Sequence, residues 1–244
     1  MVALAVAATA LLGQAAAAEL TLLSAGAVEP GIRSAIAAFE KQTPHVVKIT
    51  FNPVPQIRER IAKGERVDVV VATPAVLDEF AKAGKVDKER ASLGRVGMGV
   101  AVRVGARVPD IADGEALKRS ILAADSVIFT RGSSGVYFEG LLKKMGIYDR
   151  IQSKIARYDD GEAAFESLLR GKGNDLGAGQ VTEIRQYREK GLQLVGPLPP
   201  EVQNLTSYSA ASMATASNPA VARDFVRYLG TPAAKALFTA AGIE

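Results

Sequence analysis

The residues whose types and spacing best suit binding chemistry lie in one turn, residues 131–135, which reads Arg-Gly-Ser-Ser-Gly. The apolar run 127–129 before it predicts a buried strand. Apolar residues recur with helical spacing over 138–145, and Gly146 ends that pattern. The turn therefore connects a strand to a helix. Glycines let such a backbone approach a ligand closely, and Ser133 or Ser134 suits the N-cap position of the helix.

A helix start with free N–H groups, two hydroxyls and an arginine could hold an anion. Arg131 is the only cation between Ser120 and Leu142, and we expect it to be the main anion anchor. Arg58 is expected to matter less, because it lies beside Glu59 and Arg60 on a helix with alternating charges. Taken alone, the turn at 131–135 fits an ordinary capped turn better than a binding site, since most such turns bind nothing.

Composition excludes several classes of function. The 244 residues include no cysteine and one histidine, His45, which is expected in a loop. Disulfides, thiolate catalysis and Cys- or His-based metal sites are thereby excluded, a Ser-His-Asp triad is disfavoured, and no cofactor is expected. The net charge of +4 is scattered and tryptophan is absent, which disfavours nucleic-acid binding and weakly favours anionic ligands.

The first eighteen residues predict an export signal. Residues 2–12 are almost wholly apolar, and Ala15 to Ala18 provide a small-residue cleavage site, although no Lys or Arg precedes the apolar run. We expect cleavage after Ala18 and a periplasmic location. The mature chain would then begin at Glu19.

The mature chain alternates strands and helices, which predicts an α/β fold with parallel sheets. Three strand–turn–helix units run from Leu20 to Gly84, and a second series spans about 101–203. Strands are expected at 20–24, 46–51, 68–72, 96–104, 127–129, 154–157, 176–178, 192–195 and 205–213, and helices at 32–42, 57–63, 74–83, 117–122, 138–145, 164–169, 180–191, 219–229 and 232–240.

Three segments resemble the molybdate-type periplasmic solute-binding proteins: Leu-Thr-Leu-Leu-Ser-Ala-Gly-Ala at 20–27, Gly-Glu-Arg-Val-Asp-Val-Val-Val-Ala at 64–72, and the closing stretch 225–242. The resemblance covers the mature chain. It implies a type II periplasmic binding protein fold, in which two doubly wound lobes are joined by two crossing strands and hold a ligand between them. The expected units are the signal peptide 1–18, lobe 1 at 19–101 plus 207–244, and lobe 2 at 102–206. The expected crossing strands are 96–104 and 205–213.

The resemblance also implies a small anionic ligand, a monomer, and an ABC transporter permease as partner. The molybdate binders hold their oxyanion with serines of the first two turns, but this chain has Ala-Gly-Ala at 25–27 and two prolines, Pro53 and Pro55, at those places. We therefore expect weak binding of molybdate and tungstate, and a carboxylate-bearing organic anion as ligand. The expected ligand-binding residues are Ala25, Gly26, Ala27, Asn52, Gln56, Arg131, Ser133, Ser134, Tyr137 and Gln180.

An enzyme on the same fold is the alternative, because the branch that this chain resembles includes periplasmic aconitate isomerases. Isomerisation of such an acid needs a base near the proton that is removed. The candidates are Tyr137, Glu139, Asp159 and Glu183, of which the two glutamates better fit solvated helix positions. The main expectation is a non-enzymatic solute-binding protein that delivers the anion to an ABC-type transporter, and the isomerase is the alternative.

Overall fold

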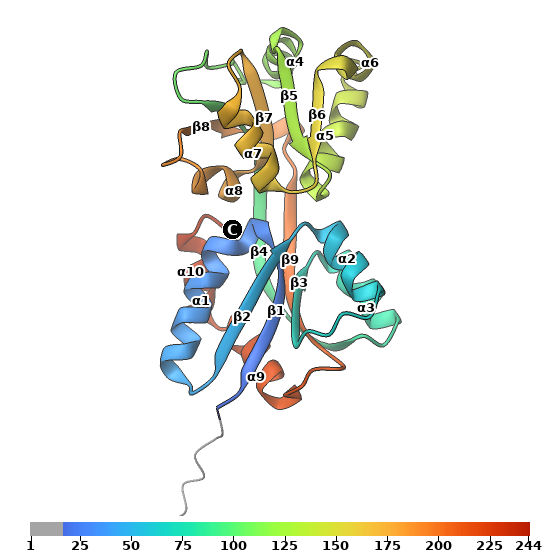
Figure 1. Cartoon of the computed structure of the whole chain (residues 1–244), viewed down its shortest axis with the longest axis vertical. Helices are drawn as coiled ribbons and strands as arrows, with labels where there is room; N and C mark the ends of the chain where they lie inside the picture. The colour runs from blue at the N-terminus through green and yellow to red at the C-terminus, as the bar shows by residue number, and fades with distance from the viewer. Residues whose placement is uncertain (1–16) are drawn as a thin grey trace, which may run out of the picture.

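The computed structural model describes residues 17–244, which form two α/β lobes joined by two long strands (Figure 1). The expected signal peptide falls almost entirely on residues 1–16, outside the described residues. The expectation of a two-lobed α/β fold is confirmed.

Lobe 1 is built on parallel strands at the start of the chain. β1 pairs in parallel with both β2 and β3, so three strand–helix units share one sheet. Its elements are β1 (Glu19–Ala25), η1 (Gly26–Val28), α1 (Glu29–Gln42), β2 (Val46–Asn52), α2 (Val54–Ala62), β3 (Val69–Ala72), α3 (Pro74–Lys82), α9 (Pro219–Leu229) and α10 (Pro232–Ala240).

Lobe 2 repeats this arrangement with a second parallel group, in which β5 pairs with β6 and β7. Its elements are α4 (Gly114–Ala123), β5 (Ser126–Thr130), α5 (Ser133–Lys144), α6 (Tyr148–Ile151), η2 (Gln152–Lys154), β6 (Ile155–Tyr158), α7 (Gly161–Arg170), β7 (Asp175–Gln180), α8 (Val181–Gln186), β8 (Leu192–Pro197) and η3 (Pro200–Val202).

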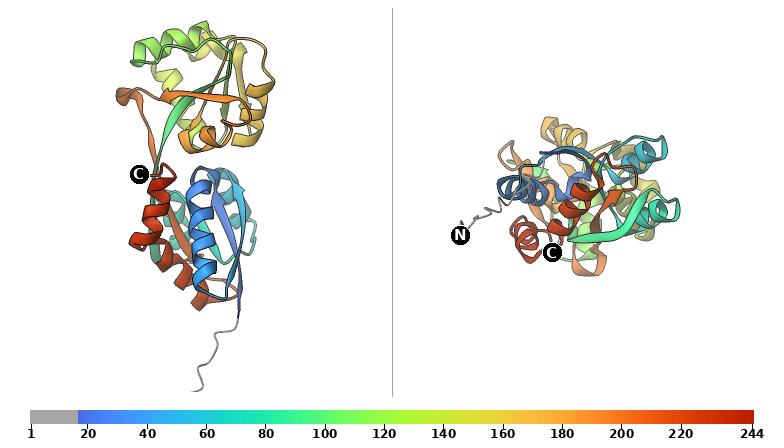
Figure 2. Two further views of the ribbon diagram at one scale, coloured as in Figure 1. Left: turned by 90° about the vertical axis from the view of Figure 1, so that its left-hand side faces the viewer. Right: turned by 90° about the horizontal axis from the view of Figure 1, so that it is seen from below.

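The two lobes are connected by β4 (Val86–Arg103) and β9 (Leu205–Met213), which pair antiparallel and run side by side from one lobe into the other (Figure 2). The resulting sheet order is β2-β1-β3-β9-β4-β7-β5-β6, with β8 paired to β4. The expected strand at 205–213 is confirmed. The expected strand at 96–104 is too short, because β4 begins at Val86. The charged run Asp-Lys-Glu-Arg at 87–90 lacks the apolar residues by which the sequence predicted strands.

Each lobe has its own apolar core. The core of lobe 1 contains β4 residues up to Val96 and β9 residues from Tyr208 onward. Lobe 2 has two smaller clusters, one of which begins at Met98 on β4. The change from one core to the other therefore falls at Gly97, where a residue without a side chain fills neither core. The exact residues at which the lobes meet remain a prediction.

Two local expectations at the turns were wrong. Gly132 occupies the N-cap position of α5, so Ser133 and Ser134 are the first two residues inside the helix and not its cap. α8 ends at Gln186, whereas the sequence predicted a helix up to Gly191; hydrogen-bonded turns, including Leu192 N–H to the Tyr187 carbonyl, take up the remainder.

Candidate functional site

Four strand ends and the helix starts that follow them enclose a small cavity between the two lobes, which we call the cradle. The carboxyl ends of β1, β2, β5 and β7 approach one another there, and ligands of open α/β sheets bind at such edges. Its volume is about 30 Å³, enough for one or two small polar groups. The lining residues are Ala25, Gly26, Ala27, Pro53, Val54, Thr130, Gly132, Ser133, Ser134, Gly161, Gln180, Glu183 and Tyr208.

The start of α5 gives the cradle its anion-binding character. The first N–H groups of a helix have no partner within the helix, and the N-cap Gly132 supplies no side chain to satisfy them. Ser134 is 5 % exposed, and its hydroxyl has no hydrogen-bond partner among residues 17–244. A hydroxyl without a partner in the protein, beside free N–H groups, is a feature that a bound anion would explain.

Gly135 allows this helix start to lie close to β5. A Cβ atom on Gly135 would stand 1.7 Å from the Thr130 carbonyl oxygen, which is far below any tolerated contact. The glycine at position 135 is therefore required by close packing of the helix against the strand end, and not by an unusual backbone angle.

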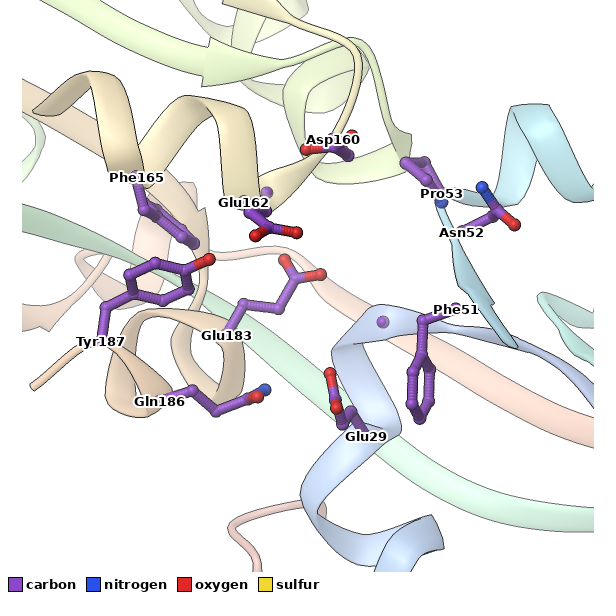
Figure 3. A pocket seen from close by; sticks show the side chains of 12 residues that line it. Glu29, Phe51, Asn52, Pro53, Asp160, Glu162, Phe165, Glu183, Gln186 and Tyr187 are labelled. Atoms are coloured by element: carbon purple, nitrogen blue, oxygen red, sulfur yellow. The ribbon is translucent and has the colours of Figure 1, made fainter. Parts of the chain in front are cut away.

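A larger cavity adjoins the cradle, and we call it the acidic chamber. It has a volume of about 190 Å³ and shares Gly26, Pro53, Gly161 and Glu183 with the cradle. Figure 3 shows β2 and the η1–α1 turn on one side and α7 and α8 on the other, with the Glu162 and Glu183 carboxylates pointing into the space between them. The remaining side chains that line it are Glu29, Phe51, Asn52, Asp160, Phe165, Gln186 and Tyr187.

Two of the four carboxylates in the acidic chamber are already engaged. Glu29 pairs with Arg33 at 2.7 Å, and Asp160 caps α7 by accepting a hydrogen bond from Ala163 N–H at 2.8 Å. Glu162 and Glu183 have no ion-pair partner within the described residues. The chamber is therefore acidic, and its described lining residues include no lysine or arginine.

Glu183 is the residue with the most unusual electrostatic environment in the site. Burial raises the pKa of this carboxyl to about 7, and the nearby charges of Glu29 and Asp160 contribute in the same direction. It occupies the third position of α8, where a glutamate commonly bonds back to the helix N-cap, yet it lines both cavities instead. A carboxyl that titrates near neutral pH can both accept and return a proton.

The structure brings together six of the ten residues expected to bind the ligand. Ala25, Gly26, Ala27, Ser133, Ser134 and Gln180 all line the cradle, although they come from three separate parts of the chain. This convergence follows from the topology, because each residue lies at or just beyond the carboxyl end of a strand in a parallel group.

Gln180 lines the cradle, but its amide is already bonded to the crossing strands. Oriented so that its nitrogen donates to the Val96 and Gly97 carbonyls at 3.2 and 3.3 Å, it accepts from the hydroxyls of Tyr208 and Thr206 at 3.2 and 3.3 Å. This orientation satisfies every partner, since a carbonyl can only accept. Gln180 thus ties β4 to β9.

Asn52 and Gln56 lie beside the cradle without turning their amides into it. The two amides bond to each other at 2.7 Å, and Asn52 also accepts from Arg60. Gln56 reaches across to lobe 2 and donates to the Asp159 carbonyl at 3.3 Å. Asn52 lines the acidic chamber, and these two residues serve contacts within lobe 1 and between the lobes.

Arg131 and Tyr137 do not line the cradle. Arg131 lines neither the cradle nor the acidic chamber; it donates to the Arg157 carbonyl at 2.8 Å and to Asp159 at 3.1 Å. Asp159 lies 28 residues after Arg131, so the residues next to Arg131 in the sequence gave no sign of this pairing. The Tyr137 hydroxyl donates to the Val202 carbonyl at 2.9 Å.

Sequence reasoning undervalued Glu183 and did not select Thr130, Asp160, Glu162 or Tyr208 for the site. Glu183 fits a solvated helix residue in sequence, but α8 lies at the junction of the lobes, where one of its faces meets η1. The useful signal was its position three residues after the end of β7. No equivalent signal marked Tyr208, which is buried within an extended, serine-rich strand.

Comparison with known proteins places this geometry in a family. The profile described as bacterial extracellular solute-binding protein matches residues 20–244. The chain belongs to that family. Family members bind small solutes, and within residues 17–244 no helix is long and apolar enough to cross a membrane.

One curated relative is closer in sequence than the two solved structures described below. A Pseudomonas sp. protein named aconitate isomerase is 34% identical over 242 residues, covering 96% of this chain and 91% of the relative.

Solved structures match the fold at lower identity. The periplasmic molybdate-binding protein of Azotobacter vinelandii has a TM-score of 0.72 at 19% identity, covering 92% of this chain and 98% of that one. The sulfate-binding protein of Mycobacterium tuberculosis has a TM-score of 0.75 at 21% identity, covering 93% and 86%. This family member therefore has the type II periplasmic binding protein fold.

Proposed function

We propose that this protein isomerises a small unsaturated carboxylic acid by moving a proton, with aconitate as the first substrate to test. The observation that carries the proposal is Glu183, a carboxyl with a pKa of about 7 that lines both the cradle and the acidic chamber. The name of the Pseudomonas relative supports the choice of substrate.

The chemistry requires a group that first removes and then returns a proton. Aconitate carries a methylene group beside a carbon–carbon double bond that is conjugated with carboxylates. The Glu183 carboxylate would take a methylene proton, the electron pair would shift across three carbons, and the glutamic acid would return the proton to the far carbon. The double bond moves by one position, which gives the same compound with either cis or trans geometry. A pKa near 7 suits both halves of this step.

The cradle would stabilise the charge that develops in this step. Removing the methylene proton places negative charge on a conjugated carboxylate. The free N–H groups at the start of α5 and the Ser134 hydroxyl supply donors directed at such a group, and they are held in place before the reaction begins. Tyr208 lines the same cavity, and burial raises its pKa, so its hydroxyl stays protonated and keeps its hydrogen bond to Gln180.

The test is conversion of cis-aconitate followed by proton NMR, together with binding by calorimetry. Glu183→Gln keeps the shape of the side chain and is expected to lower turnover by about 100-fold or more while binding is retained. The matched control is Glu189→Gln, an exposed residue in the turn after α8. Equal turnover by wild type and Glu183→Gln would exclude Glu183 as the proton-transferring group.

The second candidate is a periplasmic binding protein that delivers an anion to an ABC transporter. It is favoured by the solved molybdate- and sulfate-binding proteins with this fold. The same experiment separates the two, because wild-type protein that binds the acid and never converts it would be a transport protein.

A further inference from the structure

A third cavity lies on the other side of the cradle, and we call it the outer groove. It has a volume of about 570 Å³ and is formed by α2 and the start of α3 in lobe 1, α5 in lobe 2, and β9. It shares Val54 and Ser133 with the cradle. A molecule with one group in the cradle can therefore extend past Ser133 into the groove.

The two neighbours of the cradle have opposite electrostatic character. The acidic chamber is lined by four carboxylates, whereas the described residues that line the outer groove include no Asp or Glu and one cation, Arg58. An anion that continues beyond the cradle meets like charges on one side and an opposite charge on the other. The groove is the favourable direction for a second carboxylate.

Arg58 is placed and bonded so that it can bind such a group. Its Nε pairs with Glu79 at 2.7 Å, which orients the guanidinium and leaves the terminal nitrogens for a further acceptor. Its side chain is 59% exposed, so the Arg58 charge is solvated when no anion is bound. Thr206 on β9 and Asn204 just before that strand add polar groups to the same groove.

We infer that Arg58 is a specificity-determining residue, which holds a second carboxylate in the outer groove while the first lies in the cradle. The inference rests on the proposed function and narrows it, because it restricts the substrates to di- and tricarboxylic acids. It also places selectivity on α2, far in sequence from the turn at 131–135.

Binding of two unreactive acids tests this inference without relying on turnover. Tricarballylate, a saturated tricarboxylate, and butyrate, a monocarboxylate, are titrated into wild type, Arg58→Gln and Arg131→Gln. Arg131 is the matched control: it is 58% exposed and has one acidic partner, but it lines none of the three cavities.

Arg58→Gln is expected to weaken tricarballylate about tenfold and to change butyrate less than about twofold, because only the tricarboxylate reaches the groove. Arg58→Lys should restore part of the loss. Arg131→Gln should match wild type with both acids.

Equal affinities of Arg58→Gln and Arg131→Gln for tricarballylate would overturn the inference, as would a wild type that prefers butyrate or binds neither acid. A different result would contradict the proposed function. If the protein binds tricarballylate through Arg58 but never converts aconitate, the role of Arg58 in the groove stands and the isomerase activity is excluded.

Discussion

Glu183 is the residue on which the chemistry depends, and its environment also affects folding. Its pKa is about 7 in the folded protein against an ordinary value of 4.5. Between these values the folded state binds more protons than the unfolded state, so this residue makes the protein less stable as pH rises from about 4.5 to about 7.

Replacing Glu183 by glutamine should remove this pH dependence. The full shift corresponds to roughly 3 kcal/mol, at about 1.4 kcal/mol per pKa unit, which is an upper bound on the gain. Glu183→Gln is therefore expected to raise the free energy of unfolding by about 1–3 kcal/mol at pH 8 and by much less at pH 5, as measured by urea denaturation. Glu189→Gln should show no such difference. A gain for Glu183→Gln that is equal at both pH values would contradict the shifted pKa.

A second prediction at residue scale concerns two glycines of α5. Gly135→Ala would drive a Cβ atom into the Thr130 carbonyl, whereas a Cβ on Gly140 meets nothing within 4 Å. We expect Gly135→Ala to destabilise the protein by about 2–4 kcal/mol and to impair binding, because the helix start must move away from the cradle. Gly140→Ala should stabilise it by about 0.5–1 kcal/mol. Thermal unfolding of the pair checks this, and similar melting temperatures would show that α5 can shift freely.

At the scale of elements, the sequence was most informative where its period was clear. The strand at 46–51 and the final two helices agree with the structure because their apolar residues pack into the core of lobe 1. The first half of β4 was missed because it exposes Lys88 and Glu89, and alternation of apolar residues is lost there.

The candidate site was predictable only in part, for a related reason. Sequence locates strand ends, and six of the expected residues meet there. It does not reveal which side chains a distant element will contact, and so the ion pair between Arg131 and Asp159 was not predicted. For the same reason the sequence did not predict the raised pKa of Glu183. This shift results from burial of the carboxyl and from the charge of Glu29 in the other lobe.

One bond between elements offers a test of how the lobes are held together. The Thr182 hydroxyl on α8 donates to the Ala27 carbonyl of η1 at 2.6 Å, and both residues are buried. Thr182→Val keeps the shape but removes the donor, which leaves a buried carbonyl unpaired when the lobes meet. We expect the affinity for tricarballylate to fall about 3- to 10-fold by calorimetry. Thr239→Val, at an exposed position on α10, is the control, and equal affinities would show that this bond does not favour closure.

At the scale of the whole molecule, the cradle and acidic chamber lie between lobes that touch through Thr182 and Gln56. The cradle has a volume of about 30 Å³, so we expect separation of the lobes to widen the path by which a ligand enters it. Bending of β4 and β9 is the motion that the topology permits, because these strands connect the two cores.

Lobe movement predicts a change in overall size. Solution X-ray scattering should give a radius of gyration that falls by about 1 Å when tricarballylate is added, as expected for hinge closure around a ligand. A radius that stays constant at saturating ligand would indicate a preformed site in a rigid molecule.

The central claim is that Glu183 transfers the proton, and the pH profile of kcat/KM tests it most directly. For wild type we expect kcat/KM for cis-aconitate to rise with pH through an ionisation near 7, as the Glu183 carboxyl loses its proton. Glu29→Gln removes one of the charges that raise this pKa, so the same rise should move to lower pH. A rise that stays at the same pH in Glu29→Gln, or a profile that is flat from pH 5 to pH 9, would contradict the claim.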